Sequence, residues 1–216
     1  MKYQYIHQHE GARRADLLMS GWAADEHLFA DLPDTGDDLI VCYDYSDLTL
    51  HTAGWPEYEQ VRLLAWSMGV WAAEHTPALQ GLNLTDCLAV NGTPRPIDEH
   101  CGIPPRVFEL TLRGMSGAAL VKFRHRMCGD TYAYFMRHLP QRSLEDMQHE
   151  LATIGRQALS LPEGRLPWTR ALVATADVIM PTANQQQAWQ ERGVRVCMTE
   201  GAHYAPQYFE EWRSRR

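Results

Sequence analysis

The chain has 216 residues, a length that favours one domain, or one domain with a small inserted cap. Its net charge of -7 argues against a protein that binds nucleic acid through bulk charge, and no apolar run approaches the ~20 residues of a membrane span. The N-terminus lacks an apolar run of signal-peptide length, and the five cysteines are scattered without a Cys-x-x-Cys spacing. We therefore expect a cytoplasmic protein without a disulfide framework or a structural zinc site.

Short apolar runs along the chain predict buried strands. They are continuous rather than alternating, as expected when helices cover both faces of a parallel sheet. Several of the segments between them could form covering helices, and this alternation is typical of α/β proteins. The predicted strands span 17–19, 39–45, 61–66, 88–91, 171–175 and 194–198, with a less apolar candidate at 3–9, and the predicted helices span 23–32, 68–75 and 184–192.

Residues 104–167 break this alternation and contain helical patterns only. Helices are predicted at 116–127, at 131–139 and from Ser143 to about residue 158, where Asp146 follows Ser143 in a capping-box arrangement. We interpret 104–167 as a helical cap, inserted into a core formed by residues 1–103 and 168–216. The stretch 104–170 holds ten Lys or Arg and six Asp or Glu, so a basic region interrupts an acidic chain.

The predicted strand 61–66 runs directly into a turn that is typical of a nucleophilic serine. Ser67 follows the strand and a helical pattern follows Ser67, the strand–turn–helix context that lifts a serine hydroxyl above a sheet. The usual Gly-x-Ser-x-Gly motif is here Ala65-Trp66-Ser67-Met68-Gly69, in which alanine, larger by one methyl group, takes the place of the first glycine. Taken alone, a Ser-x-Gly sequence is more often a helix N-cap.

Two later strands supply the partners that a serine nucleophile needs. Asp177 follows the predicted strand 171–175, and His203 follows the predicted strand 194–198, which gives the order Ser, Asp, His found in α/β hydrolases. The alternative for Asp177 is a turn or helix cap before Pro181. We predict a catalytic triad of Ser67, Asp177 and His203 on an α/β-hydrolase fold, a mostly parallel sheet with helices on both faces and a small helical cap.

Other polar residues have simpler interpretations. Asp44 and Asp47 are rival carboxylates, but they precede Ser67 in the chain, which is the wrong order. His7 and His9 have a metal-like His-x-His spacing, although histidines at the start of a chain are more often surface residues. We predict no metal and no cofactor, because no partner at ligand spacing accompanies the remaining candidates, His100, Cys101 and His125.

An oxyanion hole requires backbone N–H groups near the nucleophile. One is expected from Met68, directly after Ser67, and the other from Trp22 in Ser20-Gly21-Trp22, where Gly21 lets the backbone approach the substrate. The Trp22 indole would then form one wall of the acyl pocket. Cap residues that could also line this pocket, with simple helix core as the alternative, are Phe123, Met127 and Phe135.

Motifs in both the core and the cap carry a family likeness. They are Ser20-Gly21-Trp22, Cys42-Tyr43-Asp44-Tyr45, Ala65-Trp66-Ser67-Met68-Gly69-Val70-Trp71-Ala72, Asn91-Gly92-Thr93, Phe123-Arg124-His125-Arg126-Met127-Cys128-Gly129 and His203-Tyr204. With these motifs the chain resembles, over nearly its whole length, the BioG-type pimeloyl-acyl-carrier-protein methyl ester esterases (DUF452-like, α/β-hydrolase superfamily).

The resemblance implies a reaction and a partner. The reaction would be hydrolysis of the methyl ester of pimeloyl-acyl-carrier protein in biotin synthesis, through the predicted triad and an acyl-enzyme. The partner would be an acidic carrier protein, which a basic cap could attract, and we expect a monomer that binds neither nucleic acid nor membranes. The candidate carrier-facing residues are Arg113, Lys122, Arg124, Arg126, Arg137 and Arg142.

Two alternatives stay open at this point. The first is a general small-acyl carboxylesterase or a thioesterase, which would share the triad but not the dependence on a carrier protein. The second is a binding module with a hydrolase fold and no activity, which the presence of all three triad residue types argues against.

Overall fold

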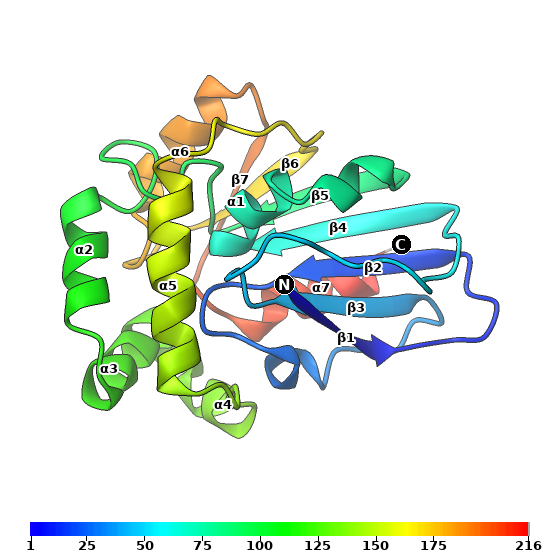
Figure 1. The fold of residues 1–216 in the computed structure, drawn as a ribbon, viewed down its shortest axis with the longest axis horizontal. Helices are drawn as coiled ribbons and strands as arrows, with labels where there is room; N and C mark the ends of the chain where they lie inside the picture. The colour runs from blue at the N-terminus through cyan, green and yellow to red at the C-terminus, as the bar shows by residue number, and fades with distance from the viewer. Residues whose placement is uncertain (216) are drawn as a thin grey trace.

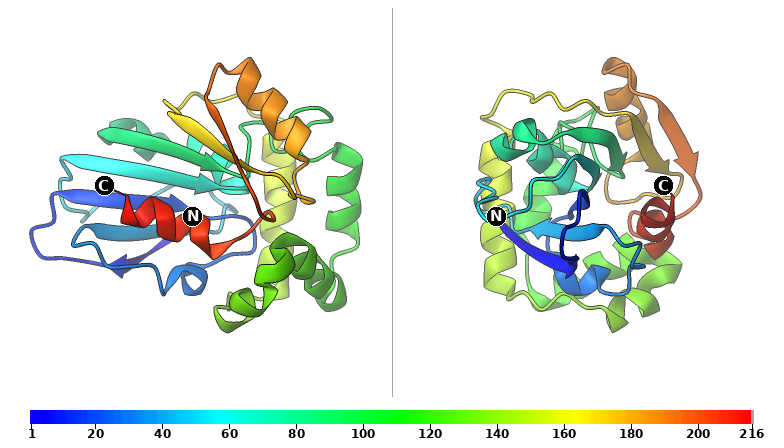
Figure 2. Two further views of the ribbon diagram at one scale, coloured as in Figure 1. Left: turned by 180° about the vertical axis from the view of Figure 1, so that it is seen from behind. Right: turned by 90° about the vertical axis from the view of Figure 1, so that its right-hand side faces the viewer.

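The computed structural model describes residues 1–215, which form a seven-stranded sheet with helices on both faces (Figures 1 and 2). The strand order is β1-β3-β2-β4-β5-β6-β7, and only β1 is antiparallel to its neighbour. The strands are β1 (Lys2–His7), β2 (Arg14–Met19), β3 (Asp38–Tyr43), β4 (Gln60–Trp66), β5 (Leu84–Val90), β6 (Arg170–Ala174) and β7 (Val196–Thr199). The six predicted strands and the candidate at 3–9 are confirmed, with ends that differ by a few residues.

Two apolar layers cover the sheet, one on each face. Successive residues of a central strand alternate between them, because neighbouring side chains of a strand point to opposite faces. Leu63 belongs to the layer that also contains Trp71 and Trp189, whereas Leu64 belongs to the layer that contains Phe209. Since both faces are buried, the carboxyl halves of the central strands are apolar, as at residues 17–19 and 63–66, which is why the sequence shows continuous runs.

Three helices outside the predicted cap pack on the sheet. They are α1 (Met68–Glu74), α6 (Thr182–Glu191) and α7 (Pro206–Ser214). Helix α7 crosses the face opposite α1 (Figure 2). Helices α1 and α6 match the predictions at 68–75 and 184–192, but α7 was not predicted. Short 3₁₀ turns occur at η1 (Glu26–Phe29), η2 (Pro77–Gly81) and η3 (Gly129–Thr131).

Residues 104–167, between β5 and β6, contain four helices that lie beyond the carboxyl ends of the strands (Figure 1). They are α2 (Pro105–Arg113), α3 (Gly117–Cys128), α4 (Tyr132–Arg137) and α5 (Leu144–Ala158). The last three are the predicted helices. As predicted, the Ser143 side chain caps α5 by accepting a hydrogen bond from the Asp146 N–H, at 3.0 Å. Helix α2 was not predicted, because its prolines were interpreted as a joint, yet Pro105 occupies the first helical position, where a missing N–H costs little.

The helix predicted at 23–32 is wrong. Ala23 has a φ of +66°, outside the α-helical region, and only the short turn η1 forms here. The Asp25 side chain caps that turn by accepting a hydrogen bond from the His27 N–H. Trp22, which precedes Ala23, follows the end of β2 at Met19 and therefore lies at the carboxyl end of the sheet.

None of the helices within residues 1–215 is both long enough and apolar enough to cross a membrane.

Candidate active site

Ser67 lies in the turn between β4 and α1 and has an unusual backbone conformation. Its φ is +57° and its ψ is -124°, a region that residues with a side chain rarely adopt and that is found at functional sites. The Ser67 N–H donates to the Val90 carbonyl at 2.9 Å. A Cβ atom at Gly69 would lie 2.3 Å from the Met19 carbonyl oxygen, and one at Gly92 would lie 2.3 Å from the Ser67 carbonyl oxygen. The turn therefore needs glycine at both positions.

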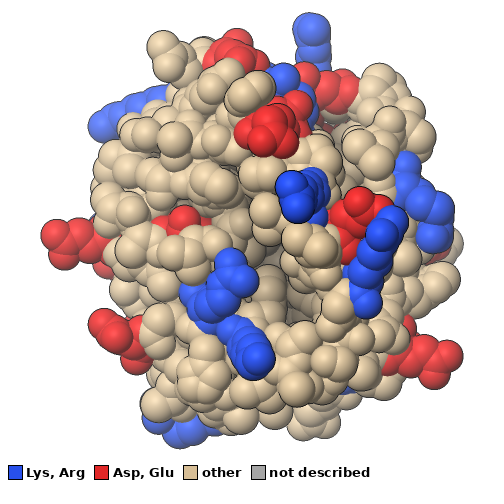
Figure 3. All heavy atoms as spheres, turned by 90° about the vertical axis from the view of Figure 1, so that its left-hand side faces the viewer, with Lys and Arg blue, Asp and Glu red and all other residues tan. Residues whose placement is uncertain are grey.

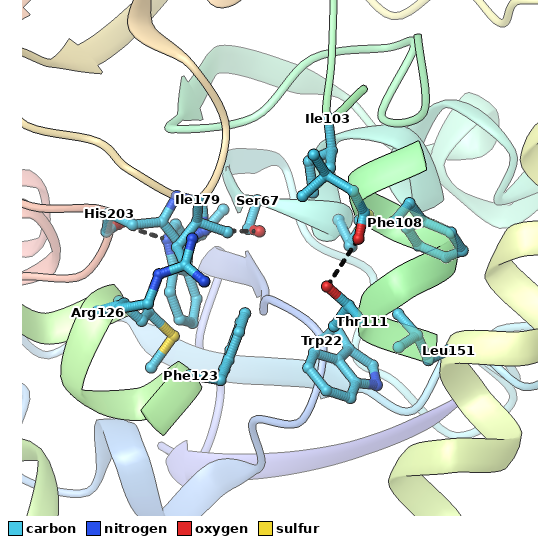
Figure 4. Close-up of a pocket in the computed structure, with 14 residues that line it drawn as sticks. Trp22, Ser67, Ile103, Phe108, Thr111, Phe123, Arg126, Leu151, Ile179 and His203 are labelled. Atoms are coloured by element: carbon cyan, nitrogen blue, oxygen red, sulfur yellow. Dashed lines mark hydrogen bonds between the residues drawn. The ribbon is translucent and has the colours of Figure 1, made fainter. Parts of the chain in front are cut away.

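The side chains of Ser67, His203 and Asp177 form a hydrogen-bonded chain. The Ser67 Oγ lies 2.8 Å from the His203 Nε2 (Figure 4), and the His203 Nδ1 lies 2.7 Å from the Asp177 Oδ2. All three residues are buried, with exposed fractions of 6%, 1% and 6% for Ser67, His203 and Asp177. The structure thus brings together the three residues that were predicted to meet, although they come from three separate loops.

Asp177 follows β6 and is held by the turn that leads to α6. Its Oδ1 accepts hydrogen bonds from the backbone N–H groups of Ile179 and Met180, both at 2.9 Å. Its Oδ2 faces His203. The sequence left two interpretations of Asp177 open, a turn before Pro181 and a contact with an imidazole. The structure shows both, because one carboxylate oxygen accepts the hydrogen bonds of the turn and the other faces His203.

His203 lies in the loop between β7 and α7, and its backbone is fixed by two side chains that the sequence did not single out for this purpose. The Trp66 Nε1 donates to the His203 carbonyl at 3.0 Å, and the Asn91 Nδ2 donates to the same oxygen at 2.9 Å. Both donors end buried strands, Trp66 in β4 and Asn91 directly after β5. A polar group at the carboxyl end of a buried strand was the signal that could have identified them.

Trp22 and Met68, the predicted oxyanion-hole residues, line the same pocket as Ser67. The loop that carries Trp22 approaches Ser67 closely, since a Cβ atom at Gly21 would lie 3.2 Å from the Ser67 Cβ. The Trp22 indole is anchored from the insertion, because its Nε1 donates to the Met147 carbonyl of α5 at 2.8 Å.

The pocket above Ser67 is lined mainly by apolar side chains (Figure 4). Trp22, Phe123 and Met127 line it, as predicted, but Phe135 does not. Phe135 is 2% exposed and packs against Tyr204, with ring centroids 5.5 Å apart. The lining residues are Trp22, Trp66, Ser67, Met68, Ile103, Val107, Phe108, Thr111, Phe123, Arg126, Met127, Leu151, Ile179 and His203. Those from α2 were missed because α2 itself was not predicted.

The basic residues predicted to face a carrier protein do not share one environment. Figure 3 shows Lys and Arg side chains around a hollow on the face of the molecule that the insertion forms. Arg124 is half-buried, and its guanidinium lies 5.8 Å from the centre of the Phe135 ring. Burial lowers the pKa of Arg124 from its ordinary value. The exposed members are Arg113, Lys122, Arg126 and Arg137.

Arg142 contradicts the prediction that it faces a carrier protein. Its side chain is 5% exposed and forms ion pairs with Glu150 at 2.5 Å and with Asp44 at 3.3 Å. Glu150, on α5, is fully buried and also accepts hydrogen bonds from the backbone N–H groups of Tyr45, at 2.8 Å, and Ala23, at 3.4 Å. Arg142 and Glu150 therefore join the insertion to the loops after β2 and β3, and Asp44 takes part in this network rather than in the triad.

One group of side chains within residues 1–215 is compact enough to hold a metal ion, Asp25 with Glu26 and His27. The Asp25 carboxylate already accepts hydrogen bonds from two backbone N–H groups, that of His27 at 3.1 Å and that of Gln141 at 2.6 Å. These contacts cap η1 and fix the start of the segment that leads to α5, which accounts for the arrangement without an ion.

Comparisons with known proteins give a consistent result. The profile of a family described as "Pimeloyl-ACP methyl esterase BioG" matches residues 1–215. The crystal structure of BioG from Haemophilus influenzae superposes with a TM-score of 0.86 and 34% identity, and the match covers 98% of each chain. The enol-lactonase from Burkholderia xenovorans, at 12% identity and a TM-score of 0.67 over 98% of this chain and 91% of that one, shares the fold. The predicted α/β-hydrolase fold is thus confirmed.

A curated relative from Bacteroides fragilis is 41% identical over 201 residues and is named malonyl-[acyl-carrier protein] O-methyltransferase. The match covers 92% of this chain but only 41% of that protein, so the chain spans about two fifths of the relative's length. Given the family match over residues 1–215 and the superposition on a BioG crystal structure, the chain belongs to the BioG family of pimeloyl-ACP methyl esterases, which are carboxylic ester hydrolases.

Proposed function

We propose that this protein hydrolyses the methyl ester of pimeloyl-acyl-carrier protein, with Ser67, His203 and Asp177 as a catalytic triad and an acyl-enzyme as intermediate, as a step of biotin synthesis. The observation that carries the proposal is the hydrogen-bonded chain from Ser67 through His203 to Asp177 at the base of an apolar pocket. Membership of the BioG family supports the choice of substrate.

In the first half of the reaction, the His203 Nε2 accepts the Ser67 proton while the Ser67 Oγ attacks the ester carbonyl carbon. The Asp177 carboxylate, hydrogen-bonded to the Nδ1, stabilises the imidazolium that forms. The backbone N–H groups of Trp22 and Met68 hold the oxyanion of the tetrahedral intermediate. Protonated His203 then gives its proton to the leaving methanol, and the pimeloyl group remains on Ser67 as an ester.

In the second half, His203 accepts a proton from a water molecule, which attacks the acyl carbonyl carbon. Collapse of the second tetrahedral intermediate returns a proton to Ser67 and releases pimeloyl-acyl-carrier protein with an ionised carboxyl group.

Residues 104–167 act in this proposal as a cap that completes the pocket above the core. Helix α2 contributes Val107, Phe108 and Thr111 to the lining, and α3 contributes Phe123 and Arg126. The methylene chain of the pimeloyl group would lie against these side chains. Its other end, which is joined to the carrier protein, has to extend out of the pocket past the cap.

The proposed partner is an acidic carrier protein that docks on the exposed face of the cap. Arg126 both lines the pocket and is exposed, so it lies where the acyl chain meets the carrier protein. Complementary charge would raise the encounter rate and orient the carrier protein. Beside these charges lie apolar side chains of α2, Val107 at 44% and Leu110 at 63% exposed, which could pack against the carrier protein.

The direct test is incubation of the protein with methyl-pimeloyl-carrier protein, followed by intact-mass detection of methyl loss and by measurement of methanol. We expect turnover by the parent protein, and a loss of several orders of magnitude in Ser67→Ala, because triad residues act as a unit. Ser160→Ala, a variant of an exposed serine in the same chain, is the control and should behave as the parent does. Equal rates in Ser67→Ala and the parent would refute the triad.

The same assay separates the proposal from a general carboxylesterase or thioesterase. We expect carrier-bound methyl pimelate to be hydrolysed with a much higher kcat/KM than free dimethyl pimelate. Equal kcat/KM values for the two substrates would show that the carrier protein is not recognised. Release of the pimeloyl group from the carrier protein, instead of methanol, would show a thioesterase.

A further inference from the structure

Gln185, in the first turn of α6, makes an unusual use of a buried amide. The residue is fully buried, and its Nε2 donates hydrogen bonds to the Asp177 Oδ2 and to the Met180 carbonyl, both at 2.8 Å. A buried primary amide is costly unless it is hydrogen-bonded, so an apolar side chain would be the simpler filling for this place. The two contacts instead join α6 to the loop that carries the triad carboxylate.

The orientation of this amide follows from its neighbours. Both nearby groups, the Asp177 carboxylate and the Met180 carbonyl, are acceptors only, so the side chain must turn its NH₂ group toward them. The Gln185 Oε1 is then left buried without a hydrogen-bond partner. An unpaired buried oxygen costs free energy, and the fold accepts this cost in order to keep a donor on Asp177.

Asp177 consequently accepts four hydrogen bonds. Two backbone N–H groups hold its Oδ1, whereas its Oδ2 is shared by the His203 Nδ1 and the Gln185 Nε2. The Oδ2 is the oxygen that orients the imidazole, and Gln185 is its only partner besides the imidazole among the hydrogen bonds of residues 1–215. The contact keeps the carboxylate in one rotamer as His203 gains and loses its proton.

We propose that Gln185 is a positioning residue, which fixes the Asp177 carboxylate and thereby the orientation of His203 toward Ser67. This inference rests on the proposed function, since it gives Asp177 and His203 their triad roles. Gln185 does not line the pocket, so it acts through Asp177 rather than on the substrate.

Two groups from other elements face the Asp177–His203 pair and bear on any pH-dependent test. Tyr208 of α7 is near Asp177, and burial, together with the charge of Asp177, raises the pKa of Tyr208 to about 12. Arg126 of α3 lines the pocket together with His203. Since the pKa of Tyr208 is about 12, Tyr208 keeps its charge between about pH 5 and pH 9. Changes in that range therefore report on the Asp177–His203 pair and on residue 185.

The first test is Gln185→Glu, which keeps the size of the side chain and replaces the amide with a carboxyl group. When this group ionises, it repels the Asp177 carboxylate and favours the protonated form of His203. We expect the acidic midpoint of the profile of kcat/KM against pH, measured with a p-nitrophenyl ester, to rise by about one pH unit. This midpoint does not depend on the fraction of the protein that is folded.

The matched control is Gln186→Glu, which makes the same change of charge at the next residue of α6, where the side chain is exposed. Its profile should match that of the parent. A profile of Gln185→Glu that superposes on those of the parent and Gln186→Glu, together with an unchanged kcat of Gln185→Leu, would overturn the positioning role.

The second test is Gln185→Leu, which removes the donor but fills the space. We expect kcat to fall about tenfold, the effect of about 1.4 kcal/mol on a barrier, with KM nearly unchanged because residue 185 does not touch the pocket. A kcat equal to that of the parent would contradict the proposal. Labelling with a fluorophosphonate, detected by intact mass and lost in Ser67→Ala, separates this proposal from the proposed function. If the parent forms no adduct, both proposals fail. If the parent forms the adduct but the Gln185 variants keep the kinetics of the parent, only the role of Gln185 is refuted.

Discussion

Ser67 combines an unfavourable backbone conformation with a position that only glycine neighbours allow. Its positive φ costs free energy that the surrounding structure has to supply. Gly69 and Gly92 make this possible, because the backbone of the turn lies against them at distances that no Cβ atom could accept. The proposed nucleophile is thus presented by close backbone packing as much as by its own hydrogen bonds.

Gly69→Ala should therefore both destabilise the protein and impair Ser67. The new methyl group would lie 2.3 Å from the Met19 carbonyl oxygen and 2.4 Å from that of Ser20, so the loop leading to Trp22 must shift. We expect a loss of about 1–3 kcal/mol in the free energy of unfolding, measured with urea, and a lower rate of fluorophosphonate labelling. Gly81→Ala is the control, since a Cβ atom there meets nothing within 4 Å. Equal stability of the two variants would show that the turn has room.

At the residue scale, the sequence was sufficient to find the three members of the candidate triad but not the residues that hold them. Ser67, Asp177 and His203 each follow a strand, and their order is a property of the chain. The roles of Asn91 and Gln185 depend on side-chain contacts between loops that are distant in sequence, and no local pattern encodes such contacts. The prediction that Arg142 faces a carrier protein was wrong for the same reason, because the charge of a residue does not reveal that it pairs with a buried carboxylate, here that of Glu150.

Helix α5 is tied to the core by buried polar contacts as well as by apolar ones, because Glu150 accepts hydrogen bonds from Tyr45 and Ala23, and its ion-pair partner Arg142 also contacts Asp44. Burial raises the pKa of Glu150, and the neighbouring Arg142 opposes this effect. Arg142→Gln would leave the Glu150 carboxylate buried without its cation. We expect this variant to lose about 3–5 kcal/mol in the free energy of unfolding. Arg137→Gln, at an exposed position on α4, should change it by less than about 1 kcal/mol, and similar losses in both variants would contradict the structural role of Arg142.

The five cysteines report on the packing of separate elements. Burial raises the pKa of Cys87 and of Cys128 to about 12 and that of Cys101 to about 11, so their thiolates are scarce at neutral pH. Cys197, on the edge strand β7, is only half-buried. We expect one thiol per chain, that of Cys197, to react with Ellman's reagent within minutes at about pH 8. The Cys197→Ser variant should lack this rapid phase of the reaction. A rapid phase that persists in Cys197→Ser would show that an inner element opens.

At the element scale, patterns predicted the strands and most helices, and the errors have physical causes. Helix α7 was missed because the sequence does not show that one face of the sheet needs a further covering helix, and the apolar residues of α7 pack on that face. The false helix at 23–32 has helix-forming residues, but Ala23 adopts a left-handed conformation so that its N–H can reach Glu150. Tertiary contacts outweigh local preference at both places.

The whole molecule separates charge by position. The acidic chain carries its basic stretch in the insertion, on the side where the pocket opens. If this asymmetry guides an acidic carrier protein, kcat/KM for the carrier-bound ester should fall as the salt concentration rises, because salt screens exposed charges beyond about 10 Å at 0.1 M. The kcat/KM for a small uncharged ester should stay constant. A parallel response of both substrates would argue against charge guidance.

Charge reversal tests the direction of this attraction. Arg113→Glu, on the exposed face of α2, should lower kcat/KM for the carrier-bound ester several-fold at low salt and leave hydrolysis of small esters unchanged. Arg195→Glu makes the same change just before β7, at the opposite end of the strands from the pocket, and serves as the control. Equal losses in the two variants would assign the effect to net charge rather than to a docking face.

The hydrogen bond from the Trp22 indole to the Met147 carbonyl, together with the contact between Ala23 and Glu150, has a consequence for how substrate enters. Helix α5 holds the loop that carries Trp22, whose backbone N–H is proposed to bind the oxyanion. An outward movement of α5 would therefore displace this N–H group from Ser67. We therefore expect α5 to stay in place over the pocket during turnover. Substrate would then enter where α2 and α3 line the pocket, and we expect motion of these two helices, rather than outward movement of α5, to limit how fast long acyl chains enter.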